Sequence, residues 1–367
     1  MTSPARLKAT PLRSAHARMG ARMVDFGGWE MPLQYSGILD EHHAVRRNVG
    51  IFDVSHMGEI EIHGPEAIEL AEYVTTNSVS RLKEGQIQYS GLLYSHGGFV
   101  DDVLVHRTGP QSVFICVNAA NQEKDYAHIR RANRWNAVAE FASERFAQLA
   151  IQGPNSAAVL QPLCHADLAG IRYYNFIDSA VLGSPARIAR TGYTGEDGFE
   201  VYIAPEHAER VWDRLLDSGQ IHGIKPCGLG ARNTLRLEAG MALYGHEIDA
   251  TITPFEANLA WIVKMQKGDF LGREALERQV ARGVKRKLIG FEMLGREVAR
   301  DGCEVSVRGC ASGWVTSGGP SPTLKKNIGL CYLPVEHAVP DLEIEILVRG
   351  RRCSARTVVA PFYKRER

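Results

Sequence analysis

The feature of this sequence that most restricts its fold is a change of periodicity after Trp261. Residues 264–287 are rich in charge, with the runs KGDF, GRE and RGVKRK, and this composition is typical of a connecting helix followed by a linker. Beyond them, apolar and acidic residues alternate, as in residues 342–346. A period of two is the pattern of strands with one buried face, so the sequence predicts a small antiparallel β domain from residue 285 onward.

The part before this change mixes helical and strand patterns, and it therefore predicts an α+β region. Apolar runs at residues 112–117 and 146–151 have the length of strands, and helical patterns follow Pro65 and Pro154. The clearest helix begins at Pro205 and ends at Gly219. Its apolar residues recur at helical spacing and are predicted to face a core: Ala208, Val211, Trp212, Leu215 and Leu216.

Composition narrows the classes of function. The 367 residues include 43 Lys and Arg against 42 Asp and Glu, so the net charge of +1 provides no overall attraction to nucleic acid or to anionic lipid. We find no apolar run near the roughly 20 residues of a membrane helix. The seven cysteines contain no C-x-x-C pair. We therefore expect neither a disulfide framework nor a cysteine-based zinc site, and a small-molecule enzyme in a reducing cytoplasm is the first interpretation.

The common catalytic motifs of nucleotide-binding proteins, zinc proteases and serine hydrolases are absent. Asp53, Ser55 and His56 have the residue types of a catalytic triad. Their spacing is too tight for triad geometry, and we predict a turn stabilised by Asp53 and Ser55 instead.

Two adjacent carboxylates interrupt the apolar run at residues 96–105. A strand alternates its faces, so either Asp101 or Asp102 must point where apolar neighbours point. A carboxylate held there is desolvated unless it is paired or used in chemistry. Alternation does not choose between the two residues. The alternative to a functional role is that the carboxylate lies at the start of a strand and accepts hydrogen bonds from N–H groups of the preceding loop.

The segment at residues 191–200 has three glycines and three carboxylates, and it predicts a turn that leads Glu200 into a strand. A carboxylate in this position is able to accept two parallel N–H bonds from the edge of a pterin or guanine ring. The alternative is a hairpin whose acids are solvated.

Arg232 and Arg236 are four residues apart, so on a helix they share a face. An arginine paired with an acid there is structural, whereas an unpaired one facing a cleft suits a carboxylate ligand. The two prolines and two glycines of residues 316–324 predict a rigid loop of structural character.

Taken together, these segments resemble the T-protein family, the aminomethyltransferases of the glycine cleavage system. The resemblance runs almost end to end, and its strength lies in the order and spacing of the motifs. They are TPL at residue 10, MVDFGGWEMP at 23, DEHHAVR at 40, FDVSHM at 52, GYTGED at 192, KPCGLGAR at 225, TLRLEAG at 234, LYGHE at 243, VTSGGPSPTL at 315 and PFY at 361.

The resemblance implies three domains in a ring around a tetrahydrofolate site. We expect residues 1–265 to form the folate-binding region as two intertwined α+β subdomains, residues 266–284 a linker helix, and residues 285–367 an antiparallel β-barrel. The family takes an aminomethyl group from the lipoyl arm of a partner, the H-protein. It releases ammonia and forms 5,10-methylene-tetrahydrofolate, without a metal.

The resemblance also implies roles for single residues. Asp102 resembles the essential aspartate beside N5 and N10 of the folate, which makes it both catalytic and folate-binding. The other expected folate contacts are Tyr89, the chain around Val117, Glu200, Arg232 and, at the glutamate tail, Arg365, with Tyr363 a weaker candidate. Asn233 departs from the family pattern, which has aspartate there, and we interpret it as a tuning difference.

Two other functions stay open from the sequence. One is a tetrahydrofolate-dependent demethylase of the same superfamily, and the other is a folate-binding protein without turnover, which does not need Asp102. The chain is expected in the bacterial cytoplasm, or in the mitochondrial matrix if it comes from a eukaryote.

Overall fold

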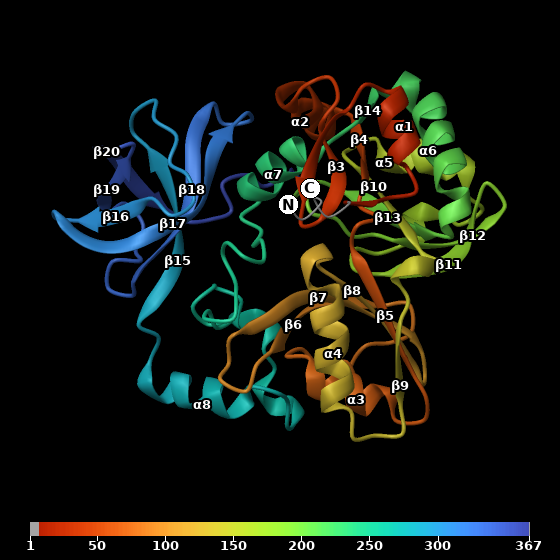
Figure 1. Ribbon diagram of the computed structural model, residues 1–367, viewed down its shortest axis with the longest axis horizontal. Helices are drawn as coiled ribbons and strands as arrows, with labels where there is room; N and C mark the ends of the chain where they lie inside the picture. The colour runs from red at the N-terminus through yellow and green to blue at the C-terminus, as the bar shows by residue number, and fades with distance from the viewer. Residues whose placement is uncertain (1–6, 367) are drawn as a thin grey trace, which may run out of the picture.

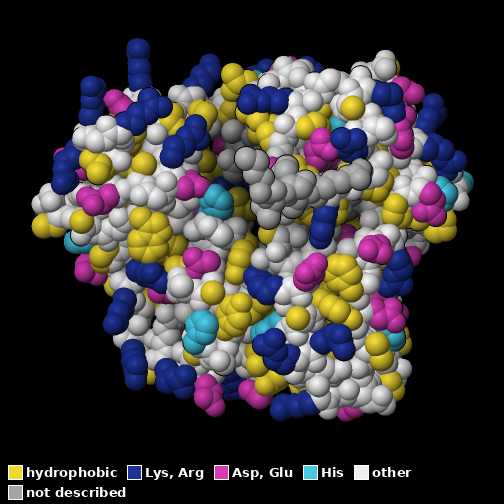
Figure 2. Space-filling view, viewed as in Figure 1, with side chains coloured by type: hydrophobic (Ala, Val, Ile, Leu, Met, Phe, Trp, Pro, Cys, Tyr) yellow, Lys and Arg dark blue, Asp and Glu magenta, His cyan; other side chains and the backbone are white. Residues whose placement is uncertain are grey.

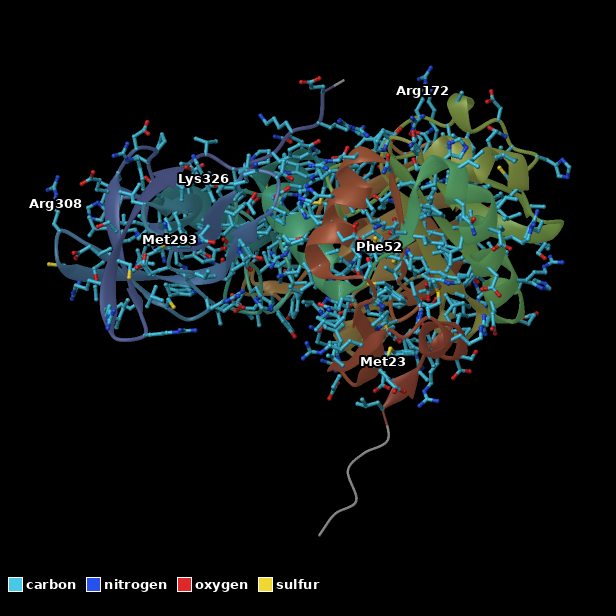
Figure 3. The ribbon with its side chains drawn as sticks, turned by 90° about the horizontal axis from the view of Figure 1, so that it is seen from above. Met23, Phe52, Arg172, Met293, Arg308 and Lys326 are labelled. Atoms are coloured by element: carbon cyan, nitrogen blue, oxygen red, sulfur yellow. The ribbon has the colours of Figure 1, made fainter. Side chains whose placement is uncertain are left out.

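A computed structural model of the chain describes residues 7–366. Three units surround a common centre, two of them α+β and one a barrel, as Figure 1 shows. This arrangement confirms the predicted fold class. Seen from above, the barrel stands beside the other two units, with Met293 in the barrel, Arg308 at its outer end and Phe52 nearer the middle of the molecule (Figure 3).

The lower unit in Figure 1 is a five-stranded antiparallel sheet with the order β6-β7-β8-β5-β9. Helices α3 and α4 cover one face, and their apolar residues share a core with valines of β7 and isoleucines of β5. The elements are β5 (Gly58–His63), α3 (Ala67–Val74), β6 (Ile87–Leu93), β7 (Phe99–Gly109), β8 (Ser112–Val117), α4 (Gln122–Ala132) and β9 (Val138–Phe141).

The upper right unit in Figure 1 is a six-stranded sheet with the order β11-β12-β13-β10-β4-β14, in which only β14 and β4 pair in parallel. Its elements are α2 (Ile38–Arg47), β4 (Val49–Asp53), β10 (Ala147–Gln152), α5 (Ser156–Leu160), β11 (Phe176–Val181), β12 (Ser184–Ala189), β13 (Gly198–Ile203), α6 (Pro205–Gly219), β14 (Ile224–Pro226) and α7 (Leu229–Glu238). The predicted helix at Pro205 is confirmed, and Ala208, Val211, Trp212 and Leu215 are fully buried along it.

Shorter elements complete these two units. A three-stranded sheet is formed by β1 (Lys8–Ala9), β3 (Trp29–Gln34) and β2 (Arg22–Phe26), beside α1 (Arg13–Arg18). Single 3-10 turns lie at η1 (Ala119–Asn121), η2 (Ser143–Arg145), η3 (Gln161–Leu163), η4 (Leu168–Gly170), η5 (Gln220–His222), η6 (Ala260–Ile262) and η7 (Met265–Lys267). The predicted turn at Asp53 is present, because the Ser55 N–H donates a 2.9 Å hydrogen bond to Asp53 Oδ1.

The third unit is a closed antiparallel barrel, reached through α8 (Arg273–Arg282). Its strands are β15 (Arg286–Met293), β16 (Glu304–Val307), β17 (Cys310–Ser321), β18 (Lys326–Pro334), β19 (Glu343–Val348) and β20 (Arg351–Val358). Ile344 and Ile346 are buried inside the barrel, as the period of two predicts. Glu343, which lies between Leu342 and Ile344 in the sequence, is exposed.

The predicted loop at residues 316–324 is wrong for most of its length, because β17 continues to Ser321. Beyond Val315, no strand other than β18 pairs with β17 in the described part of the chain, so its other edge has no partner strand there. A proline lacks a backbone N–H and is tolerated on such an edge, so Pro320 does not interrupt the strand.

The end of β17 ties the barrel to α7. Glu238 at the end of α7 is fully buried and accepts hydrogen bonds from Ser321 Oγ at 2.6 Å and from the N–H of Thr323 at 3.0 Å. It also pairs with Arg46 of α2 at 2.9 Å. One carboxylate therefore joins the six-stranded unit to the barrel, which gives the second half of the SGGPSPT motif a structural role.

Candidate functional site

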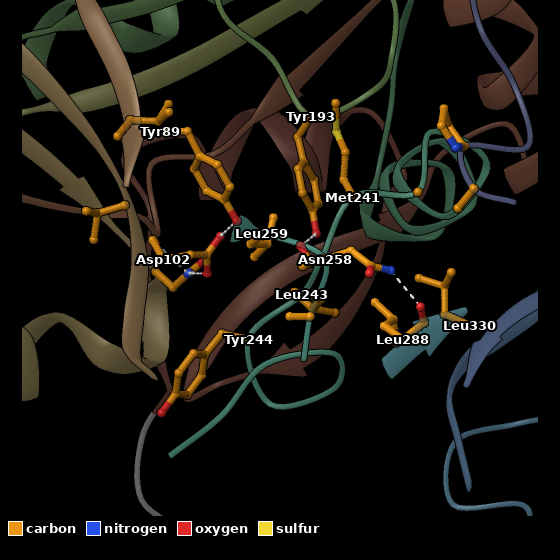
Figure 4. A pocket seen from close by; sticks show the side chains of 18 of the residues that line it. Tyr89, Asp102, Tyr193, Met241, Leu243, Tyr244, Asn258, Leu259, Leu288 and Leu330 are labelled. Carbon is orange, nitrogen blue, oxygen red and sulfur yellow. Dashed lines mark hydrogen bonds between the residues drawn. The ribbon is translucent and has the colours of Figure 1, made fainter. Parts of the chain in front are cut away.

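A cavity of about 860 Å³ lies where the three units meet. The five-stranded unit contributes Tyr89 and Asp102 to its wall, the six-stranded unit Glu200 and Arg232, and the barrel Leu288. Figure 4 shows Tyr89 and Asp102 of the five-stranded unit facing apolar side chains from the loops after α7 and from the barrel. The ring arrangement thus brings together side chains that are far apart in the sequence.

Asp102 is held at one end of the cavity by two hydrogen bonds. Tyr89 Oη donates to its Oδ2 at 2.9 Å, and Asn118 Nδ2 donates to its Oδ1 at 2.8 Å. Burial raises the pKa of Asp102 to about 7, with a further contribution from the charge of Asp101, although both hydrogen bonds act in the opposite direction. Such a carboxyl exchanges a proton readily near neutral pH, which general acid and base catalysis requires.

The choice between the two aspartates follows from the direction of each side chain on β7. Asp101 is fully buried on the face that carries Val103 and Val105, and it does not line the cavity. Its carboxylate accepts hydrogen bonds from the backbone and side chain of Asn118, both at 2.9 Å, and from Asn121 Nδ2 at 2.7 Å. Asp102 is the residue that faces the cavity, as the resemblance implies.

Glu200 lies in β13 at the other polar part of the wall and is buried. Thr191 Oγ1 donates to its Oε2 at 2.5 Å and Gln148 Nε2 to its Oε1 at 3.1 Å. Burial raises its pKa, while these donors and the nearby Arg232 act against that rise. A solvated hairpin is therefore the wrong interpretation for Glu200, which remains able to accept N–H bonds from a ligand in the cavity.

The loop before Glu200 needs its glycines because Gln152 fills the space against it. A Cβ on Gly192 would lie 1.9 Å from Gln152 Oε1, and one on Gly198 would lie 2.5 Å from Gln152 Nε2. Gln152 Nε2 in turn donates to the carbonyl of Thr191 at 3.0 Å. These contacts fix the turn that positions Thr191 and Glu200.

The two arginines of α7 differ in role. Arg236 is buried, pairs with Glu247 at 2.8 Å and donates to Asn233 Oδ1 at 2.9 Å. Within residues 7–366, the side chain of Arg232 makes no salt bridge or hydrogen bond, and its guanidinium lies 4.7 Å from the ring centre of Tyr193 in the cavity wall. Arg232 is thus available to a ligand, and Asn233 retains a hydrogen bond to Arg236.

Two of the expected folate contacts do not line the cavity. Val117 is fully buried in the core of the five-stranded unit, and the cavity wall begins with Asn118 after it. The expectation concerned the backbone around Val117, and Asn118 and Ala119 directly after it do line the cavity. Arg365 lies outside the wall, 3.4 Å from Asp197 and 5.9 Å from the ring centre of Tyr173, which does line the cavity.

Sequence reasoning missed an aromatic part of the wall. Trp261 lines the cavity, is 56% exposed, and lies against Tyr89 with ring centres 5.7 Å apart. Planar rings of this kind pack well against a flat heterocycle. The only available signal was an isolated tryptophan at the point where the periodicity changes, and it carries no indication of a cavity by itself.

Other features bear on the class of protein. In the described part of the chain, no helix is long and apolar enough to cross a membrane. Among residues 7–366, no group of three or more His, Cys, Asp or Glu side chains is placed to hold a metal ion. On the face drawn in Figure 2, basic and acidic side chains are interspersed.

The sequence matches the family model described as "GCVT N-terminal domain" over residues 12–267 and the model described as "Glycine cleavage T-protein C-terminal barrel domain" over residues 286–364. It is 48% identical to an aminomethyltransferase of Desulfitobacterium hafniense, over 98% of this chain and 99% of the relative. Identity to an aminomethyltransferase of Acidobacterium capsulatum is 50%, over 99% and 98% of the two chains. The crystal structure of glycine cleavage system aminomethyltransferase T from Bartonella henselae superposes with a TM-score of 0.92 at 32% identity, covering 98% of each chain.

Proposed function

The chain belongs to the glycine cleavage T-protein family and is an aminomethyltransferase of the glycine cleavage system, and from this premise we propose how its cavity performs the reaction. The substrates are tetrahydrofolate and the aminomethyl group on the lipoyl arm of H-protein. The observation that carries the proposal is the presence in one cavity of a carboxyl whose pKa lies near neutrality, Asp102, and of ligand-binding groups on Glu200 and Arg232.

Tetrahydrofolate binds with its pterin edge on Glu200, whose carboxylate accepts adjacent N–H groups. Arg232 supplies the positive charge on that side, and the rings of Tyr89 and Trp261 flank the flat part of the folate. Arg365, beside the Tyr173 ring, meets the glutamate tail. Held in this way, the folate amine reacts as an oriented neighbour of the aminomethyl carbon.

Asp102 moves the proton. The bond between the aminomethyl carbon and its nitrogen breaks and releases ammonia, and the carbon is attacked by a folate amine, which passes its proton to Asp102. The second folate nitrogen then displaces the sulfur of the dihydrolipoyl arm, and the departing thiolate takes up the proton that this nitrogen loses, which gives the free thiol. Proton transfer by a positioned carboxyl contributes about 10²–10⁴ in rate.

The experiment combines the purified protein with aminomethyl-loaded H-protein and tetrahydrofolate, and follows ammonia and 5,10-methylene-tetrahydrofolate together. We expect both products in equal amounts. Omission of H-protein is the control and abolishes both. The comparisons do not favour a demethylase or a folate-binding protein without turnover. Folate binding with neither product would contradict the proposal and support one of these two alternatives instead.

We also propose a division of the chain into a folate-binding region (1–265), a linker helix (266–284) and a barrel domain (285–367), of which residues 1–6 and 367 lie outside the described part. The bacterial origin of the relatives favours the cytoplasm of a bacterium as its location.

A further inference from the structure

Behind Asp102 lies a buried acid that the mechanism above does not use. Asp125 is in the first turn of α4 and is fully buried. Neither of its carboxyl oxygens has a hydrogen-bond donor among residues 7–366. A buried carboxylate without any donor is strongly disfavoured, so this side chain requires either a proton or a partner.

The neighbour of Asp125 is a second carboxyl, that of Asp101. Asn121, four residues before Asp125, donates to Asp101 Oδ1 at 2.7 Å, and burial together with the charge of Asp101 raises the pKa of Asp125 to about 11. Two carboxylates in contact repel one another unless they share a proton. The other charged groups around Asp125 are Asp102 and Lys124, and beyond Lys124 lies the phenol of Tyr244.

The hydrogen bonds decide which carboxyl carries the proton. Asp101 accepts three N–H bonds, from the backbone and side chain of Asn118 and from Asn121, and such donors stabilise its ionised form. Asp125 accepts none. Lys124 directs its ammonium to the carbonyl of Val100, to Asn121 and to Tyr244 rather than to Asp125. The charge therefore resides on Asp101 and the proton on Asp125.

This pair is connected to the reacting end of the cavity through one amide. Asn118 Nδ2 donates to Asp101 Oδ1 at 2.9 Å and to Asp102 Oδ1 at 2.8 Å. The position of the Asp101 carboxylate therefore determines where Asn118 points, and Asn118 holds Asp102.

We propose that Asp125 is a positioning residue for aminomethyl transfer, and that its protonated carboxyl donates a hydrogen bond to Asp101, which keeps Asp101, Asn118 and Asp102 in their reactive arrangement. The inference rests on the role proposed for Asp102. Asp125 itself touches neither the cavity nor a substrate.

Infrared difference spectroscopy tests the protonation directly. The carbonyl band of a protonated carboxylic acid is compared between the wild-type protein and Asp125→Asn at pH 8, without substrates. We expect the variant to lose one such band. Spectra that differ only in carboxylate bands would show Asp125 to be ionised and would overturn the inference, whatever the role of Asp102.

Kinetics test the consequence. Asp125→Asn retains a donor toward Asp101, so we expect kcat within about threefold of wild type, whereas Asp125→Ala lowers kcat roughly 10- to 100-fold with little change in the KM for tetrahydrofolate, as small misplacements of catalytic groups do. Glu123→Gln, an exposed acid of the same helix turn, is the matched control and leaves kcat unchanged.

The remaining outcomes are also decisive. If Asp125→Asn loses as much activity as Asp125→Ala while both stay folded, the donor role is wrong. If Asp125→Ala does not fold, the rescued activity of Asp125→Asn and the infrared band still decide. If Asp125→Asn behaves as expected but Asp102→Asn remains active, the pairing stands and the role proposed for Asp102 fails.

Discussion

Tyr89 and Asp102 lie diagonally across the pairing of β6 and β7, and the Tyr89 hydroxyl donates a 2.9 Å hydrogen bond to Asp102 Oδ2. In the register of these strands, Tyr89 is opposite Leu104 and Asp102 is opposite Gly91, so the phenol and the carboxyl are diagonal neighbours within hydrogen-bonding reach. This bond stabilises the ionised form of Asp102 and opposes the effect of burial on its pKa. The protonation state of the proposed catalytic group therefore depends on a residue from another strand.

Tyr89→Phe removes that bond, and the pKa of Asp102 then rises above its present value of about 7. Because the proposed base is the ionised form, the rising limb of the plot of kcat against pH moves to higher pH. At pH 7 we expect kcat to fall by about tenfold, because a hydrogen bond to a charged group stabilises the ionised form by about that factor. A profile that keeps its shape and only drops in height would contradict this explanation.

Asp102→Asn removes the proton-accepting carboxyl while retaining a side chain of the same size. We expect turnover to fall by about 10²–10⁴ while tetrahydrofolate affinity is largely preserved, because Glu200 and Arg232 remain. Product assays and a folate titration measure the two effects separately. Equal turnover in variant and wild type would remove Asp102 from the mechanism.

Glu200→Gln leaves one acceptor oxygen where the carboxylate has two. Since the pterin edge offers adjacent N–H groups, we expect the dissociation constant for tetrahydrofolate to increase roughly 10- to 100-fold. A binding titration measures it, with Glu144→Gln, an exposed acid, as the matched control that leaves affinity unchanged. Unaltered affinity in Glu200→Gln would show that the pterin lies elsewhere.

Arg232 and Arg236 on α7 are expected to give opposite phenotypes. Arg232→Ala removes a cation whose side chain makes no salt bridge or hydrogen bond among residues 7–366, so folate affinity falls roughly 10- to 100-fold while the melting temperature hardly changes. Arg236→Ala leaves the buried Glu247 uncompensated and lowers the free energy of unfolding by about 3–5 kcal/mol. Thermal melts and folate titrations of both variants check this; two similar phenotypes would refute the division of roles.

The carboxylate of Glu238 makes the attachment of the barrel sensitive to acid. Burial by itself raises its pKa, but the hydrogen bond and charge of His42, the Ser321 hydroxyl and Arg46 lower it to about 2. Glu238 therefore stabilises the fold above its ordinary pKa, and this contribution is lost as the pH falls toward 2.

Glu238→Gln is expected to lower the free energy of unfolding at pH 7 by about 3 kcal/mol and to weaken the dependence of stability on pH in the acid range. Denaturant unfolding at a series of pH values measures both effects. A variant whose stability falls with acid as steeply as that of the wild type would show that another carboxyl is responsible.

Elements with a strong local pattern were predictable from the sequence. The helix at Pro205–Gly219 and the alternation of β19 follow from the spacing of apolar residues, which reports burial of one face directly. The extent of β17 was not predictable, because Pro320 is compatible with a strand only where the neighbouring edge is empty. That condition depends on where β16 begins, at Glu304 opposite Trp314, which no local pattern reports.

Resemblance across the chain predicted the family and chose Asp102 over Asp101, whereas the residues themselves supplied the aspartate pair, Glu200, Arg232 and Arg236 as candidates. The structure shows that Glu200 and Asp102 share a cavity, and that Val117 turns into the core. Residues such as Asn118 and Trp261 act in the wall through contacts with distant segments, so nothing in their immediate sequence singles them out.

The sequence by itself determined the α+β and β character of the two parts of the chain, because secondary structure depends on periodicities within short windows. It also determined which side chains were available for chemistry. Only the tertiary structure decided that Asp102 and not Asp101 faces the cavity, and that Arg236 and not Arg232 forms a salt bridge among residues 7–366. Alternation along a strand and spacing along a helix define only relative directions. Which direction is the cavity and which is the core depends on the units that pack on either side.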